Sequence, residues 1–189
     1  MEIEGLEECP PDRLQSGLAA AAAGTAEGLT EIDLLIRDYP EDARLHFMRG
    51  SLLASEGRFA EGILAIRRAI GIAPGYDLAR FQLGLLELSS GEGAAAEATL
   101  SPLEQGGDDD PFRSLAAGLR LLMRDEFEGA VKHLRRGMEL NNIHPLINRD
   151  MQLIIDQVQP AQESQIEEEQ PVSATQLLLQ QFAVRSTRH

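Results

Sequence analysis

Few side chains in this sequence have the types and spacing that catalysis or metal binding requires. The only cysteine, Cys9, follows two glutamates, whose negative charge disfavours the thiolate that a nucleophile needs. The histidines are scattered and belong to no metal-binding or catalytic motif: His46, His133, His144 and His189. We therefore expect a protein that is not an enzyme and that has no metal and no cofactor.

Three consecutive aspartates occupy residues 108–110 and could suggest a calcium site. They lack the alternating spacing and the closing glutamate of a calcium loop, which is the alternative interpretation. The last of them precedes Pro111, and an aspartate before a proline is typical of a helix start. This cluster is therefore predicted to be a turn that ends in an N-cap.

The chain as a whole is acidic, with a formal net charge of −14 at pH 7, which argues against nucleic acid or an anionic membrane as partner. Lys132 and Arg135 each have a glutamate four residues away. This spacing predicts ion pairs on a solvated helix face. The alternative is a basic stripe formed by two arginine pairs in equivalent places two repeats apart, Arg67 with Arg68 and Arg135 with Arg136. No segment has the roughly 18 apolar residues of a membrane span and the first residues do not resemble a secretory signal, so we expect a cytoplasmic protein without membrane insertion.

A glycine recurs along the chain at an interval of 34 residues, at Gly50, Gly84 and Gly118. Twelve residues after each glycine there is another small residue: Gly62, Ala96 and Ala130. Glycine in a helix interior costs about 0.5–1 kcal/mol relative to alanine, so its recurrence indicates that two helices pack closely there. The period predicts a stack of similar units.

This pattern resembles the bacterial type of the tetratricopeptide repeat (TPR) family, whose 34-residue unit is a hairpin of two helices. The resemblance implies an all-α fold, a right-handed superhelical solenoid of about four hairpins with a capping helix. It divides the chain into an acidic extension (1–8), four repeats within 9–144 (9–42, 43–76, 77–110 and 111–144), a capping helix (145–158), an acidic linker (159–172) and a C-terminal amphipathic helix with a tail (173–189). For 145–158, a partner-binding helix is the alternative.

Three residues depart from the family pattern. His46 and Arg80 stand where the family has a large apolar residue, which indicates different packing at that corner. Pro102 lies inside the expected second helix of the third repeat, where it removes a backbone hydrogen bond. We expect that helix to kink or to end early.

The resemblance also implies a concave groove, lined by the first helix of each unit. The residues at the groove positions are mostly apolar: Phe47, Met48, Ser51, Leu78, Phe81, Leu85, Leu88, Phe112, Leu115, Leu119 and Leu122. Such a groove suits a hydrophobic or amphipathic segment of a partner protein. The alternative is that some of these side chains are buried against neighbouring hairpins.

The last residues carry a second candidate for binding. Leu178, Leu179 and Phe182 follow a helical stripe after a capping-box pattern, which predicts a docking helix. A frayed terminus is the alternative, because so short a helix needs something to pack against.

Together these features predict a non-catalytic module for protein–protein interaction. The leading function is an adaptor or chaperone for a hydrophobic or amphipathic segment, loosely similar to the small TPR chaperones of type III secretion. The alternative is a structural or assembly subunit whose C-terminal helix docks on another protein or on a second copy, giving a homodimer.

Overall fold

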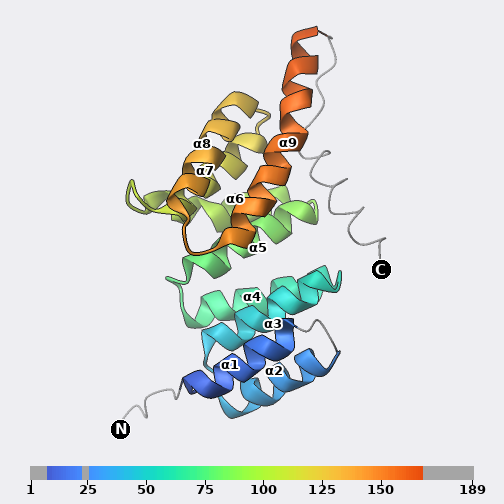
Figure 1. Ribbon diagram of the computed structural model, residues 1–189, viewed down its shortest axis with the longest axis vertical. Helices are drawn as coiled ribbons and strands as arrows, with labels where there is room; N and C mark the ends of the chain where they lie inside the picture. The colour runs from blue at the N-terminus through green and yellow to red at the C-terminus, as the bar shows by residue number, and fades with distance from the viewer. Residues whose placement is uncertain (1–7, 23–25, 168–189) are drawn as a thin grey trace. The chain divides into compact units, whose positions relative to one another are not determined.

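The computed structural model describes residues 8–22 and 26–167, and within these ranges the chain forms nine α-helices, one 3₁₀ helix and no strand (Figure 1). The all-α class predicted from the sequence is therefore confirmed for this part of the chain. The chain divides into two compact units, Met1–Leu83 and Gly84–His189, and the division falls inside one helix.

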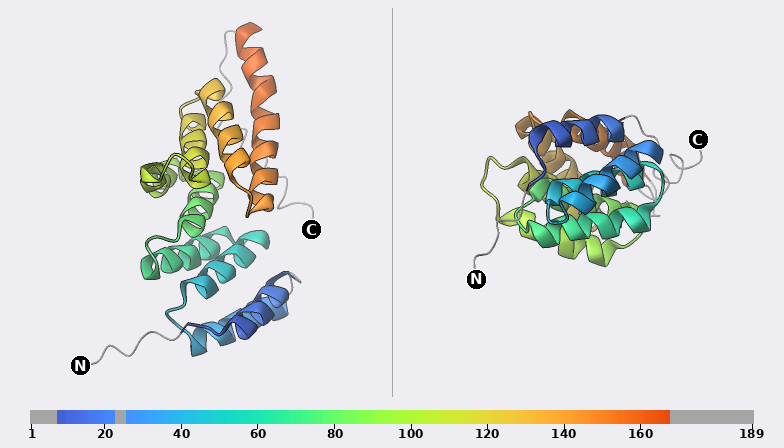
Figure 2. Two further views of the ribbon diagram at one scale, coloured as in Figure 1. Left: turned by 60° about the vertical axis from the view of Figure 1, so that its left-hand side comes forward. Right: turned by 90° about the horizontal axis from the view of Figure 1, so that it is seen from below.

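The first unit consists of two helix hairpins and the beginning of a fifth helix. Helix α1 packs on α2, and α3 packs on α4 (Figures 1 and 2). The Asp42 side chain accepts a hydrogen bond from the Arg44 N–H, which caps the start of α3 as expected from an aspartate at an N-cap. The helices are α1 (Pro11–Ala22), α2 (Ala26–Asp38), α3 (Ala43–Ser55), α4 (Phe59–Ile72) and α5 (Asp77–Ser89), of which the last crosses into the second unit.

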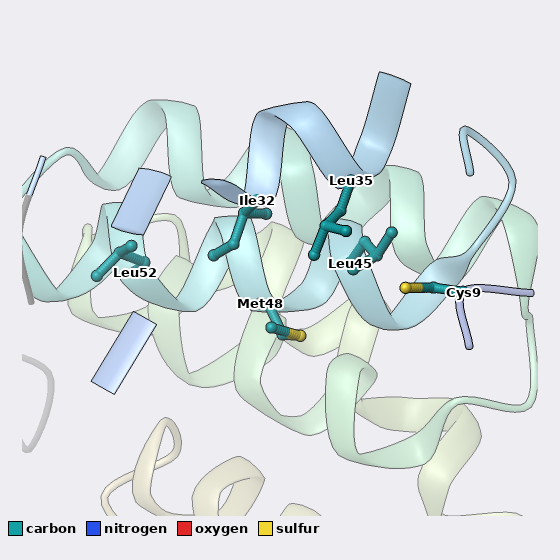
Figure 3. Close-up of a cluster of buried hydrophobic side chains, with 6 residues drawn as sticks. All are labelled: Cys9, Ile32, Leu35, Leu45, Met48 and Leu52. Atoms are coloured by element: carbon teal, nitrogen blue, oxygen red, sulfur yellow. The ribbon is translucent and has the colours of Figure 1, made fainter. Parts of the chain in front are cut away.

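The core of the first unit lies between α2, α3 and the segment before α1. Figure 3 shows the buried side chains that form it: Cys9, Ile32, Leu35, Leu45, Met48 and Leu52. The three members from α3 are spaced i, i+3 and i+7, so they share one helix face. Burial of each aliphatic side chain contributes about 1.5–3 kcal/mol, and this stripe therefore holds the hairpins together.

The second unit has one regular hairpin and one shortened one. Helix α6 ends at Leu100 and is followed by a 3₁₀ turn with Pro102 near its start, as the proline predicts. Asp110 caps the next helix, and its side chain accepts a hydrogen bond of 2.9 Å from the Phe112 N–H. The elements after α5 are α6 (Gly93–Leu100), η1 (Ser101–Gln105), α7 (Pro111–Leu122), α8 (Phe127–Leu140) and α9 (Pro145–Glu167).

Helix α9 packs against α8, and it is longer than the sequence predicts (Figure 1). Its buried residues follow a helical stripe: Met151, Ile154, Ile155 and Val158. The helix then continues through Pro160 to Glu167, so the boundary predicted at residue 158 and the linker predicted from 159 are wrong for residues 159–167. The helix-breaking tendency of proline is a free-energy cost of about 3 kcal/mol, and a helix that is already packed along its first part can continue despite it.

Candidate functional site

The recurrent glycines lie where two helices of a hairpin approach each other. A Cβ atom added at Gly50 would lie 2.8 Å from the Gly62 carbonyl oxygen, and one added at Gly62 would lie 2.9 Å from the Gly50 carbonyl oxygen. The backbones of α3 and α4 therefore touch at this pair. Close backbone approach of this kind requires the absence of a side chain on both helices.

A Cβ atom at Gly50 would also meet the Ile66 side chain, and the second unit repeats this contact with leucine side chains. A Cβ atom at Gly84 would lie 2.5 Å from Leu100, and one at Gly118 would lie 2.7 Å from Leu134 and 3.1 Å from the Ala130 carbonyl oxygen. The 34-residue interval thus corresponds to a repeated helix contact in the structure. The handedness and regularity of a superhelix remain predictions from the resemblance.

The predicted groove is not open along its length. Six of its eleven residues have an exposed fraction of 7% or less: Met48, Phe81, Leu88, Leu115, Leu119 and Leu122. These residues are packed in the interior, so the prediction that they line an accessible groove is wrong. Apolar side chains on a first helix can face either a groove or the neighbouring hairpin, and burial removes more apolar surface from water.

The remaining groove residues are partly exposed and fall in both units. Phe47, Ser51 and Leu78 belong to the first unit, and Leu85 and Phe112 belong to the second. The two aromatic residues among them, Phe47 and Phe112, each contact another ring. The Phe47 centroid lies 5.2 Å from that of Tyr76, and the Phe112 centroid lies 6.0 Å from that of His144.

In the first unit, the ring contact joins two helices of the candidate surface. Tyr76 immediately precedes α5, and Leu78 lies in the first turn of that helix. The contact of Tyr76 with Phe47 therefore holds the start of α5 against α3, which also carries Ser51. We define the candidate surface as Phe47, Ser51 and Leu78, because they are the partly exposed groove residues that these two helices contribute to the first unit.

The predicted docking helix, with Leu178, Leu179 and Phe182, lies outside the described residues. The structure nevertheless shortens the stretch of chain that connects this segment to the preceding helix. Because α9 extends to Glu167, only residues 168–172 separate it from the segment that begins at residue 173. Five residues span at most about 16–18 Å, compared with about 46–50 Å for the fourteen residues of the predicted linker.

A buried polar cluster at the start of the first unit was not predicted from the sequence. The Cys9 N–H donates a hydrogen bond of 2.9 Å to Asp42 Oδ2, and Arg44 donates to both oxygens of Asp42 and to the Cys9 carbonyl oxygen. Asp42 therefore has a second role beyond that of N-cap. Its spacing from Arg44 could have indicated an ion pair, but the contact with Cys9 arises only in the fold.

The pKa values in this cluster are shifted by burial and by the hydrogen bonds. Burial raises the pKa of Asp42, but the hydrogen bonds from Arg44 and from the Cys9 N–H outweigh it and hold that pKa below its ordinary value. Burial, with the negative charge of Asp42, raises the pKa of the Cys9 thiol. The thiol is thus held in its neutral form, which suits a packing residue better than a nucleophile.

A second polar cluster joins α6, η1 and α7 in the second unit. Arg120 forms ion pairs with Glu97 and Glu104, and Arg124 lies 3.2 Å from Glu97. The Arg120 side chain is only 16% exposed. Its hydrogen bond is the main reason why the pKa of Glu97 is lowered. This cluster connects the shortened third hairpin to the fourth.

The ion pairs predicted on the solvated face of α8 are not formed. In the described part of the chain, Lys132 and Arg135 make no ion pair with the glutamates four residues away. Arg136 instead lies 3.9 Å from Asp109 and 3.6 Å from Glu139. A spacing of four residues along a helix allows an ion pair to form. It does not ensure that the pair forms when a neighbouring loop supplies other carboxylates.

Comparison with models of known protein families and with curated proteins returned no match. Among the described residues, no helix is long and apolar enough to cross a membrane. The same residues contain no group of three or more histidine, cysteine, aspartate or glutamate side chains placed to hold a metal ion. The candidate site therefore rests on the geometry of the chain itself.

Proposed function

We propose that this protein is a non-catalytic TPR-like interaction module, an adaptor or chaperone that binds a hydrophobic or amphipathic segment of a partner protein. The observation that carries the proposal is the close helix contact that recurs with the 34-residue glycine interval. Stacked hairpins of this kind present extended surfaces for binding.

The candidate surface is smaller than the groove predicted from the sequence. It consists of Phe47, Ser51 and Leu78 on α3 and the start of α5. The Ser51 hydroxyl oxygen is itself buried, so the surface offers mainly two apolar side chains. They fit apolar anchors of a short segment better than they fit a charged terminus. Exposed anchors of this size suit a moderate affinity, because they bury little area.

A peptide library displayed on phage tests this proposal with a defined probe. Selection on the full chain is expected to yield peptides with apolar residues at i and i+3 or i+4, the spacing of an amphipathic helix. Leu78→Glu should weaken binding of a selected peptide at least tenfold, as measured by isothermal titration calorimetry. A charge at this position removes apolar contact and adds an unpaired carboxylate.

Leu64→Glu is the matched control, since Leu64 lies on α4 of the same unit and is 65% exposed. It should change the affinity less than twofold. Equal weakening by the two variants, or peptides without apolar anchors, would contradict the proposed surface. The alternative function, an assembly subunit that docks through residues 173–189, stays a prediction, because its helix lies outside the described residues.

A further inference from the structure

A pocket in the second unit occupies the place where the third hairpin is shortened. The second helices of the second and fourth repeats, α4 and α8, have 14 residues each, whereas α6 has eight. The turn η1 and the loop that follows it replace the missing helical residues. A pocket with a volume of about 400 Å³ lies between this segment, α7 and α8, lined in part by Glu104, Ser114 and Ala117.

The pocket gathers cations in a chain that is acidic overall. Its lining includes Arg113 from α7 and three residues of α8, Lys132, His133 and Arg136. The side chains of Lys132 and His133 make neither an ion pair nor a hydrogen bond within the described ranges 8–22 and 26–167. Their donor groups are therefore available to a ligand.

The carboxylates near the pocket do not block it. Glu104 is held by Arg120, so its charge is already compensated. Arg113 and Arg136 pair with Asp108, which also lines the pocket, and with Asp109 of the same loop; the two aspartate side chains are 93% and 96% exposed. Ion pairs of such exposed groups contribute little, because water and salt compete for them. A ligand with a higher charge can displace these aspartates.

We propose that this pocket binds a small phosphorylated molecule. A phosphate monoester carries a charge of about −1.5 to −2 at pH 7 and three acceptor oxygens, which matches the arginine forks, the lysine and the imidazole that line the pocket. The Ser114 hydroxyl, which also lines the pocket, adds a donor. The volume is typical of sites for small molecules and exceeds what a single phosphate group fills.

A phosphate is favoured over a single carboxylate because of the charge of the whole chain. A net charge of −14 opposes the approach of any anion, so only a ligand with strong local contacts can remain bound. The Debye length is about 8 Å at 0.15 M salt, which screens the distant carboxylates but not contacts within the pocket. Binding should therefore be measured at that ionic strength.

Titration of the full chain with inorganic pyrophosphate, followed by ¹⁵N–¹H NMR, tests the proposal. Saturable shifts are expected at the amides of residues 113–117 and 132–136. Lys132→Gln should weaken binding about tenfold or more, the loss expected for one charge-assisted contact. Arg135→Gln removes the same charge from the neighbouring exposed face and should change the Kd less than twofold.

Three results would overturn the proposal. The first is no saturable shift at 10 mM pyrophosphate. The second is equal weakening by Lys132→Gln and Arg135→Gln, which would show that the positive charge of α8 as a whole attracts the anion and that no specific contact with Lys132 is made. The third is citrate binding as tightly as pyrophosphate, which would remove the phosphate assignment. None of these results depends on the peptide-binding surface of the first unit.

Discussion

Gly50 and Gly71 lie on the two helices of one hairpin and differ only in their surroundings. An added Cβ atom at Gly50 meets both the Ile66 side chain and the backbone of α4, whereas one at Gly71 meets no atom within 4 Å. The backbone cannot move aside as a flexible side chain can. The same substitution should therefore have opposite effects at the two positions.

We expect Gly50→Ala to lower the free energy of unfolding by about 1–3 kcal/mol, the usual range for overpacking. Gly71→Ala should raise it by about 0.5–1 kcal/mol, since alanine favours a helix and no clash opposes it. Urea denaturation monitored by circular dichroism measures both. A neutral or stabilising Gly50→Ala would mean that α3 and α4 do not touch at this point.

Asp42 makes the stability of the first unit depend on pH. Its pKa in the folded protein is lowered, so the ionised carboxylate contributes stability that is fully present above its unfolded value of about 4 and is lost as the pH falls through the folded pKa. Asp42→Asn removes the charge at every pH. We expect this variant to be about 1–3 kcal/mol less stable at pH 7, through loss of a cap and of charged hydrogen bonds.

The difference between wild type and Asp42→Asn should stay constant between pH 5 and 7 and shrink below about pH 4. Denaturation curves at five or six pH values give this profile. A difference that does not change with pH would show that the capping geometry matters and the ion pair with Arg44 does not. A difference that grows in acid would reverse the sign and contradict the arrangement described here.

At the scale of elements, the sequence predicts helices better than it predicts exposure. The starts of α3 and α7 and the early end of α6 follow from Asp42, Asp110 and Pro102, because caps and prolines act through their own backbone neighbours. The extension of α9 through Pro160 could not be predicted in this way. It depends on packing along the whole helix, which outweighs a local cost.

The accessible part of the groove was predicted poorly for a similar reason. Leu115 and Leu119 have the right helical positions for a groove, but both are fully buried. Helical periodicity identifies an apolar face without showing which element covers it. The pocket beside α8 was missed because it depends on a loop, η1 and two helices that meet only in the fold.

The ion pair between Arg120 and Glu97 joins α7 to α6, and its strength can be measured. In a double-mutant cycle, Arg120→Met and Glu97→Gln should show a coupling energy of about 0.5–2 kcal/mol, because Arg120 is largely shielded from water. Arg58 and Glu61, which lie 2.7 Å apart and are both exposed, provide the comparison pair. Their coupling should be about 0.2–1 kcal/mol and should disappear in 1 M salt. Equal couplings in the two pairs would show that Arg120 does not connect the hairpins.

At the scale of the whole molecule, the chain has two compact units, and the boundary falls within α5. In stacked repeats, stability is approximately a sum of local terms and of contacts between neighbours. A local defect therefore need not spread over the whole chain. Substitution of a closely packed glycine can create such a defect in either unit, at Gly50 in the first and at Gly118 in the second.

Hydrogen exchange followed by mass spectrometry should show whether the two units open separately. With Gly50→Ala, peptides from α3 and α4 should exchange faster, by about tenfold for each 1.4 kcal/mol lost, while peptides from α7 and α8 keep their rates. Gly118→Ala should have the reciprocal effect, because its added Cβ meets Leu134 and the Ala130 carbonyl oxygen in the other unit. Two reciprocal variants exclude a general loss of stability as the cause. If each variant instead accelerates exchange equally in all four helices, the chain unfolds as one cooperative block, and the 34-residue period reflects a repeated packing pattern without separate unfolding of the units.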